Sequence, residues 1–383
     1  DVNNVLGLLK KINPSSSNQT LAALQIEDYL KTHFTVYSSE YDQLKNIDDI
    51  LKSGLANVVG ICKIYTILFD ACHINMQLVL TCDRSSLKFD PTFESLRYVS
   101  ETLIYCPDQN IFINPAESSE RWNMIDYNYL NNGALFIREE SIGNYKTGIG
   151  ITGFIPANDA AKSVDSIQVS LLLDADDLSN VHASIDRTLS GYVCGFQNYF
   201  NLFDSDEKKG LLNDYIKLLG SDSKITNLKI TNTPYKVNPV LPFNIKADAI
   251  VYSLIENAGD KFLLKIGECI GAQSELYSNS TRENPIDNTF NRGYVRTLSV
   301  NIPQGYKIAN AEALDFDVEF KHADTTYCFF KSSYSIDNNQ LTININEFYN
   351  QISMPATDYE SFRAVINAAA DFQKVKLLFE KLN

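Results

Sequence analysis

The sequence predicts an α+β protein built from three consecutive parts. Apolar residues recur at helical spacing near the start, a helix and three strand-like runs occupy residues 60–116, and short strand-like runs dominate after residue 240. A chain of 383 residues is too long for one ordinary domain. We therefore expect an α+β domain at 1–138, an α+β domain or insert at 139–239, and a β-sandwich with a C-terminal helix and final strand at 240–383.

Composition and charge exclude some classes of partner. Hydrophobic residues make up 44% of the chain and aromatic residues 11%, which is enough for packed cores. The 33 basic and 47 acidic residues give a net charge of −14, which argues against nucleic acid or an anionic membrane surface as the main partner and favours solubility. No run approaches the roughly 18 apolar residues of a membrane helix, so we expect a protein that does not span a membrane.

The cysteines and histidines give no sign of a metal site. The seven cysteines are odd in number, and none forms a pair or a Cys/His cluster at zinc spacing. The acidic run 174–177 lacks the glycine and the distal glutamate of a calcium loop, so a solvated hairpin is the better interpretation. We predict no cofactor and no metal.

Four helices are predicted before the first strand. The fourth is the best defined, because its apolar residues recur at steps of three and four and share one face. The first three are expected near residues 2–9, 20–32 and 46–53, with Thr20 as a cap of the second and Gly54 ending the third. The apolar stripe of the fourth comprises Val58, Ile61, Cys62, Tyr65, Phe69 and Cys72.

The residues after this helix favour the layout of a thiol site. A strand at 76–81 is followed by two strand-like runs, 99–106 and 111–114, which a turn at 107–110 separates. This layout resembles papain-like and transglutaminase-like thiol sites, in which the first of the paired strands carries a histidine and the second an Asp or Asn. Here the histidine position is empty.

The rest of the chain is predicted mostly as strands. Residues 139–161, with three glycines and Pro156, indicate a boundary, and 166–173 with 182–189 indicate a hairpin. Helical stretches near 191–203 and 205–219 and a strand at 225–233 complete the middle part. The C-terminal part is predicted to hold a helix at 359–372, an edge strand at 375–379, and strands at 247–254, 261–266, 295–302, 316–321, 325–334 and 341–345.

Residues 60–116, with the three helices before them, resemble the transglutaminase-like superfamily. More narrowly, the chain is similar to bacterial envelope proteins of unknown function in which a transglutaminase-like domain is flanked by β-rich domains. Residues 296–306 resemble that group's strand ending in Ile-Pro-x-Gly-Tyr, and Pro355 with Tyr359 and Arg363 resembles the helix entry before its final strand. The group's usual N-terminal β domain is missing, so we expect a piece of a longer protein or a shorter member.

The resemblance implies a triad with one member lost. In active relatives the nucleophile is a cysteine in a Gly-x-Cys context at a helix start, and Cys62 matches. By position, Glu101 replaces the histidine, and Asn114 before Pro115 replaces the orienting aspartate. A carboxylate would raise the pKa of the thiol and has no proton to give near neutral pH. Loss of one triad member typically costs on the order of 10⁴–10⁶ in rate.

Each of these residues also has a structural interpretation. Cys62 fits a buried core thiol, Glu101 a solvated or Arg-paired strand residue, and Asn114 a turn residue before proline. A rescuing imidazole would have to come from His33 or from His73, and His73 ends the same helix about 15 Å from Cys62.

Three further residues are candidates for binding. Trp122 and Arg121 follow the predicted site and would line a groove, although a lone tryptophan more often packs in a core or at its rim. Arg84 follows Asp83 at a strand end and fits either a family feature or a structural ion pair or turn.

We therefore expect a non-catalytic, exported bacterial protein that binds or scaffolds a protein, peptide or glycan at the cell envelope. The periplasmic or secreted location is implied by the resemblance alone. The sequence begins at Asp1 without a leader, which says nothing about export. The alternative is an active cysteine-dependent peptidase or transglutaminase-like amide hydrolase using Cys62. A third possibility is a module that binds glycans or peptides through aromatic residues.

Overall fold

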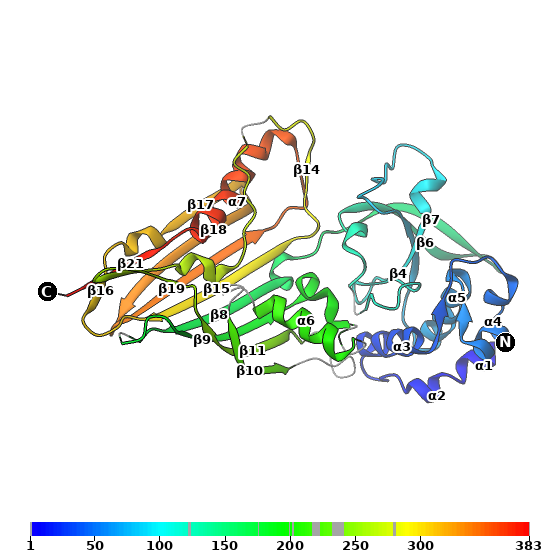
Figure 1. Ribbon diagram of the computed structural model, residues 1–383. Helices are drawn as coiled ribbons and strands as arrows, with labels where there is room; N and C mark the ends of the chain where they lie inside the picture. The colour runs from blue at the N-terminus through cyan, green and yellow to red at the C-terminus, as the bar shows by residue number, and fades with distance from the viewer. Residues whose placement is uncertain are drawn as a thin grey trace. The chain divides into compact units, whose positions relative to one another are not determined.

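The chain folds into two compact α+β units, Asp1–Pro156 and Ala157–Asn383. The structure is a computed structural model, shown in Figure 1. It describes residues 2–121, 124–174, 176–198, 200, 203–216, 223–231, 241–278 and 281–382. No helix among these residues is long and apolar enough to cross a membrane.

Five helices open the N-terminal unit. The first predicted helix is broken in two, and the second is capped by Asn18 rather than Thr20, since the Asn18 side chain accepts a hydrogen bond from the Leu21 N–H. Gly54 ends the next long helix in a left-handed conformation with φ of 73°, as predicted. The helices are α1 (Val2–Leu6), α2 (Leu9–Ile12), α3 (Gln19–His33), α4 (Ile47–Ser53) and α5 (Val58–Ala71).

The start of α5 is held by two residues that leave little room for change. The side chain of Asn57 accepts a hydrogen bond from Gly60 N at 2.9 Å and donates one to Ser39 O at 3.0 Å. A Cβ on Gly60 would lie 2.1 Å from the carbonyl oxygen of Leu44 and 2.5 Å from Cδ1 of Ile50. Packing against the preceding segments is therefore sufficient reason for a glycine two residues before Cys62.

A five-stranded sheet follows these helices, in the order β5-β4-β3-β6-β7. The predicted pairing of two strands around the turn at 107–110 is confirmed, with Ile104 opposite Ile113. Ile104, Cys106 and Ile113 belong to the same buried cluster as the apolar face of α5. The strands are β3 (Gln77–Thr81), β4 (Glu101–Cys106), β5 (Ile111–Ile113), β6 (Asn132–Ile142) and β7 (Tyr145–Ile155); β1 (Thr35–Val36) and β2 (Leu55–Ala56) form a separate parallel pair.

The chain divides between Pro156 and Ala157, inside the predicted boundary zone of residues 139–161, but most of that zone is regular strand. β6 and β7 form a long antiparallel hairpin there, which turns at Gly143 with φ of 63°. Residues 145–154 are exposed on both faces, so they lack the two-residue apolar alternation that identifies a half-buried strand. The expected domain boundary after residue 138 therefore falls inside β6.

The C-terminal unit contains an eight-stranded sheet in the order β10-β11-β9-β8-β15-β19-β18-β17. The predicted hairpin of β8 and β9 is confirmed, and β8 also pairs with β15 in parallel. The remaining neighbours are antiparallel. The strands are β8 (Val164–Leu172), β9 (Val181–Leu189), β10 (Lys224–Thr231), β11 (Phe243–Val251), β15 (Arg292–Asn301), β17 (Phe316–His322), β18 (Thr325–Asp337) and β19 (Gln340–Tyr349).

A second layer covers one face of this sheet. It consists of a four-stranded sheet in the order β12-β13-β21-β16, and of helices α6 (Ser205–Ile216) and α7 (Tyr359–Gln373), which share one buried cluster with the large sheet. The predicted sandwich is thus completed partly by helices (Figure 1). The smaller strands are β12 (Ile255–Ala258), β13 (Lys261–Leu264), β16 (Tyr306–Ile308) and β21 (Leu377–Lys381), and β14 (Ile286–Asp287) pairs with β20 (Ser353–Met354).

Two sequence-based expectations differ from this arrangement. The strand predicted at 375–379 as an edge strand is β21, which lies between β13 and β16. Strands from 139–239 and from 240–383 share the eight-stranded sheet, so the structure has two units where three parts were expected. The expected boundary between 239 and 240 lies outside the described residues.

Candidate functional site

Cys62 is the fifth residue of α5 and faces the core of the N-terminal unit. Its exposed fraction is 7%, and it belongs to the cluster that includes Ile61 and Tyr65. Burial raises the pKa of the thiol to about 12, because an apolar environment disfavours the thiolate. A thiol in this position behaves as a small hydrophobic group.

The predicted partners of Cys62 have other hydrogen bonds. Glu101, at the start of β4, accepts a hydrogen bond from the Tyr129 hydroxyl at 3.3 Å, and burial raises the pKa of its carboxyl. Asn114 donates to Oε2 of Glu120 at 3.0 Å and accepts from the Ala116 N–H at 3.1 Å. Across the described parts of the chain, no hydrogen bond or ion pair joins either side chain to Cys62.

The two histidines considered as rescuers are exposed. The ring of His33 is stacked on Tyr29 with centroids 3.9 Å apart, and its Nδ1 lies 2.8 Å from the Tyr29 carbonyl oxygen. His73 follows the end of α5, as predicted, and has a φ of 56°. In the described part of the chain, neither histidine ring contacts the thiol of Cys62.

The predicted binding residues Arg121 and Arg84 are buried. Arg121 forms an ion pair with Asp28 at 2.6 Å, and its Nε donates to the Ser118 carbonyl oxygen at 2.9 Å. Arg84 donates to the Tyr127 carbonyl oxygen at 3.5 Å. The neighbouring Asp83 accepts a hydrogen bond from the Ser85 N–H at 2.7 Å, which fits the turn interpretation. Trp122 lies outside the described residues.

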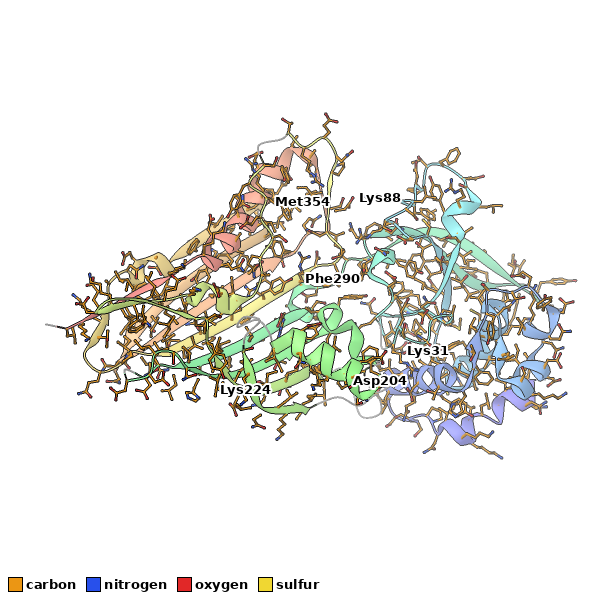
Figure 2. All side chains as sticks on the ribbon, in the orientation of Figure 1. Lys31, Lys88, Asp204, Lys224, Phe290 and Met354 are labelled. Atoms are coloured by element: carbon orange, nitrogen blue, oxygen red, sulfur yellow. The ribbon has the colours of Figure 1, made fainter. Side chains whose placement is uncertain are left out.

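A pocket of about 240 Å³ lies against α5 near Cys62, which is not itself part of the lining. The α5 residues on its wall are Ile61 and Tyr65, which precede and follow Cys62 on the helix. Lys31, labelled in Figure 2, contributes from α3, and the segment 115–118 after Asn114 closes another side. The pocket therefore occupies the space between the cysteine helix and the end of the second paired strand.

A buried polar network borders this pocket, and the sequence did not reveal it. Lys31 is paired with Glu27 at 2.9 Å, and both side chains are at most 3% exposed. Lys31 also donates to the carbonyl oxygen of Glu120. Burial raises the pKa of the Glu120 carboxyl to about 7, although the hydrogen bond from Asn114 acts to lower it. The only signal in the sequence was the four-residue spacing of Glu27 and Lys31, which ordinarily indicates an exposed helix pair.

Tyr65 carries the one hydroxyl at this pocket that is buried without a partner. The residue is fully buried, and its hydroxyl oxygen has no hydrogen-bond partner among the described residues. Burial, and then the charge of Glu27, raise the pKa of Tyr65 well above its usual value. An unsatisfied buried hydroxyl costs free energy, so it marks either strain or a place for a ligand atom.

None of the seven cysteines forms a disulfide, and only Cys72 is partly exposed. In the described parts of the chain, no group of three or more His, Cys, Asp or Glu side chains is placed to hold a metal ion. Thiol chemistry at this site would therefore have to come from Cys62 itself.

Comparisons with known proteins relate the fold to two findings. A family model described as a domain of unknown function with a solved structure (DUF3858) matches residues 267–379, within the C-terminal unit. The whole structure is similar to a crystal structure, at 2.00 Å resolution, of "a putative protease" from Parabacteroides distasonis ATCC 8503, with a TM-score of 0.50 and 10% sequence identity over 99% of this chain. This chain spans 55% of that protein, and no curated protein matches it. At this identity the likeness shows a shared fold.

Proposed function

We propose that the chain is a non-catalytic relative of the transglutaminase-like proteins, which binds a peptide, protein or glycan in the periplasm or at the cell envelope. The observation that carries this proposal is the buried thiol of Cys62, whose pKa is about 12. At pH 7 such a thiol is ionised to about 1 part in 10⁵, and only the thiolate is a nucleophile.

The surroundings of Cys62 support loss of catalysis. In a thiol hydrolase, an imidazole removes the proton from the thiol and later protonates the leaving amine. The residue at the histidine position, Glu101, is hydrogen-bonded to Tyr129 instead. Asn114 is hydrogen-bonded to Glu120, so it holds a carboxylate where a relative would hold an imidazole.

The pocket beside Cys62 supports a binding role. Its volume of about 240 Å³ is below the roughly 300–1,000 Å³ of sites that enclose a whole small molecule, which favours capture of one side chain or one sugar ring of a longer partner. Thr32 and Ser118 offer polar groups on its wall and Ile61 offers an apolar one, whereas the ammonium of Lys31 is already paired with Glu27. The structural neighbour is described as "a putative protease", and a peptide-binding pocket retained without a working nucleophile is consistent with that description.

Alkylation of the folded protein with iodoacetamide across pH 5–9, followed by peptide mapping, tests the loss of catalysis. We expect Cys72 to be modified first because it is the partly exposed cysteine, and Cys62 to stay unmodified throughout. Selective modification of Cys62 below pH 7 would overturn the proposal. A Cys72→Ser variant removes the competing thiol and shows whether any residual labelling belongs to Cys62.

The active alternative makes a separate prediction. A cysteine-dependent peptidase or amide hydrolase would cleave a peptide or exchange a glutamine amide, and Cys62→Ala would abolish that activity. We expect wild type and Cys62→Ala to be equally inactive on a panel of amide substrates.

The binding role is tested at the pocket. Trp122 is the one tryptophan of the chain, so its fluorescence reports ligand addition without labels. Ala116 is exposed on the pocket wall, and Ala116→Leu should obstruct it at little cost to folding. We expect Ala116→Leu to weaken binding of peptides or glycan fragments that quench Trp122, while Ala71→Leu, the same change at an exposed alanine outside the pocket, leaves binding unchanged.

A further inference from the structure

The covered face of the eight-stranded sheet changes character along its strands. On β19 the buried positions are Leu341, Ile343 and Ile345, and the next two in the same phase are Glu347 and Tyr349. On β9 the buried apolar alternation is interrupted by Arg187. These charges are in phase with the core residues, so the strand pattern places them on the covered face of the sheet.

Strand pairing brings the charged positions of four strands together. Asp165 on β8 lies beside Tyr294 on β15, which lies opposite Glu347 on β19. Arg292 lies opposite Tyr349, and Arg187 on β9 neighbours Asp165 diagonally. The cluster is therefore fixed by sheet register.

A cavity of about 200 Å³ lies over this cluster, which we call the arginine pocket. Its charged lining comprises three arginines and two carboxylates: Asp165, Arg187, Arg292, Arg296 and Glu347. Ile366 of α7 and the segment 270–274 form the opposite wall without adding a charge. The volume far exceeds the roughly 10–15 Å³ that one water needs, so the cavity can hold an organic group.

Two of the three arginines are neutralised within the sheet. Arg187 forms a two-pronged ion pair with Asp165, at 2.9 Å and 2.5 Å, and stacks on Tyr215. Arg296 pairs with Glu347 at 2.7 Å, and the second oxygen of Glu347 accepts a hydrogen bond from the Tyr349 hydroxyl at 2.7 Å. Both carboxylates are thus occupied, as buried charges require.

The third arginine, Arg292, has no carboxylate partner in the part of the chain that the structure describes. Its guanidinium lies 4.7 Å from the centroid of the Tyr349 ring, and its Nε donates to the Tyr294 hydroxyl at 3.1 Å. Its Nη1 donates to the Phe290 carbonyl oxygen at 3.4 Å. Among the described residues no acidic group lies within ion-pair distance of it, so the pocket keeps an excess of one positive charge.

We propose that the arginine pocket binds the carboxylate of a small organic acid or of a peptide C-terminus, with Arg292 as its ionic partner. A guanidinium presents a planar fork that matches a carboxylate, and the contact with the Tyr349 ring helps to hold this one in place. One surplus positive charge matches a monoanion, whereas a phosphate dianion would remain partly uncompensated. The pocket lies wholly in the C-terminal unit and does not depend on Cys62.

Calorimetric titration at low salt tests the proposal with four probes: N-acetylalanine, the neutral N-acetylalaninamide, inorganic phosphate, and an acetylated trialanine with a free C-terminus. We expect N-acetylalanine and the acetylated trialanine to bind, and the neutral amide not to bind. Tighter binding of N-acetylalanine would indicate a small organic acid as the ligand, and tighter binding of the trialanine would indicate a peptide C-terminus. Arg292→Gln should weaken binding at least about ten-fold, the loss of one charged hydrogen bond, and Arg292→Lys should restore part of it.

Arg282→Gln is the matched control. Arg282 also stacks on a tyrosine, Tyr359 at 5.2 Å, and also lacks a carboxylate among the described residues, but it is exposed outside the pocket. It should leave binding unchanged. Tighter binding of phosphate than of either carboxylate would overturn the assignment, as would equal affinity of wild type and Arg292→Gln or no binding of any carboxylate at millimolar concentration. Since Arg292 has no ion pair with a described residue to lose, thermal unfolding should be nearly unchanged in Arg292→Gln.

Discussion

Both units bury charged side chains, but they compensate the buried charges in different ways. In the N-terminal unit two buried cations each have their own carboxylate, Lys31 with Glu27 and Arg121 with Asp28. In the C-terminal unit three arginines share two carboxylates, and Arg292 is left with tyrosines and a carbonyl oxygen. A network of paired charges needs no external counter-ion, whereas a cation without a paired carboxylate attracts an anion.

The scaffolds also differ. The N-terminal network joins a helix, α3, to the loop that carries Glu120 and Arg121, while the C-terminal cluster stands on four paired strands. Sheet register holds neighbouring side chains at fixed separations. The comparison teaches that the polar cluster of the C-terminal unit is positioned more precisely than the network near Cys62 in the N-terminal unit.

Removing a carboxylate from the C-terminal cluster should have the largest effect. We expect Glu347→Gln to lower the free energy of unfolding of this unit by about 3 kcal/mol or more, because Arg296 is left buried without its counter-charge. Arg292→Gln should cost less than about 1 kcal/mol. Hydrogen exchange of the β15 and β19 amides measures both, and equal losses would remove the distinction between the structural arginines and Arg292.

Gly60→Ala should damage the N-terminal unit alone. The added Cβ meets the Leu44 carbonyl oxygen at 2.1 Å, so α5 has to shift, at a cost of about 3 kcal/mol. Exchange protection of α5 should fall while that of β15 is unchanged. Gly210→Ala is the control, since a Cβ there meets nothing within 4 Å and should stabilise α6 by up to about 1 kcal/mol. Tolerance of Gly60→Ala would contradict the packing reason for this glycine.

The stability of the N-terminal unit should fall as pH rises from about 4.5 to 7. Burial raises the pKa of Glu120 from its ordinary 4.5 to about 7, so in this window the folded state holds a proton that the unfolded state has lost. The contribution is complete below pH 4.5 and is lost as pH rises through 7, a change of about 3 kcal/mol. Urea unfolding at several pH values measures it. Glu120→Gln should remove the step, and the exposed Glu117→Gln should keep it.

Two tyrosine-to-phenylalanine changes should have small effects of opposite sign. Tyr65→Phe removes a buried hydroxyl that has no partner among the described residues, so it should stabilise the N-terminal unit by about 1 kcal/mol. Tyr349→Phe removes a donor to Glu347 and should destabilise the C-terminal unit by about 1.5 kcal/mol. Thermal unfolding of the two variants measures both changes in stability. A destabilised Tyr65→Phe would mean that its hydroxyl is satisfied in solution.

Much of the fold could be predicted from the sequence because the signals were local. The apolar stripe of α5 and the turn between β4 and β5 each depend on residues close in the chain. The hairpin of β6 and β7 was missed because it buries neither face over most of its length. The shared sheet was missed because pairing of β8 with β15 joins residues more than a hundred positions apart.

The candidate sites were less accessible to prediction. The position of Cys62 on the core face of its helix followed from spacing, but the raised pKa of Glu120 depends on three segments that meet only in the fold. The charges of the arginine pocket did leave a trace, since Glu347 and Arg187 continue the phase of buried residues along their strands. A charged residue in step with a hydrophobic alternation is a signal that a sequence alone can reveal.

The parallel pair of β8 and β15 has a consequence for synthesis of the protein. All strands of the N-terminal sheet lie within residues 77–155, so that sheet can assemble while the rest of the chain is still being made. The β8–β9 hairpin, by contrast, is translated long before β15, and until then the edge of β8 that pairs with β15 has no partner strand. A ribosome that pauses between residues 190 and 292 would expose an unpaired strand edge, and this interval is where a chaperone would be needed most.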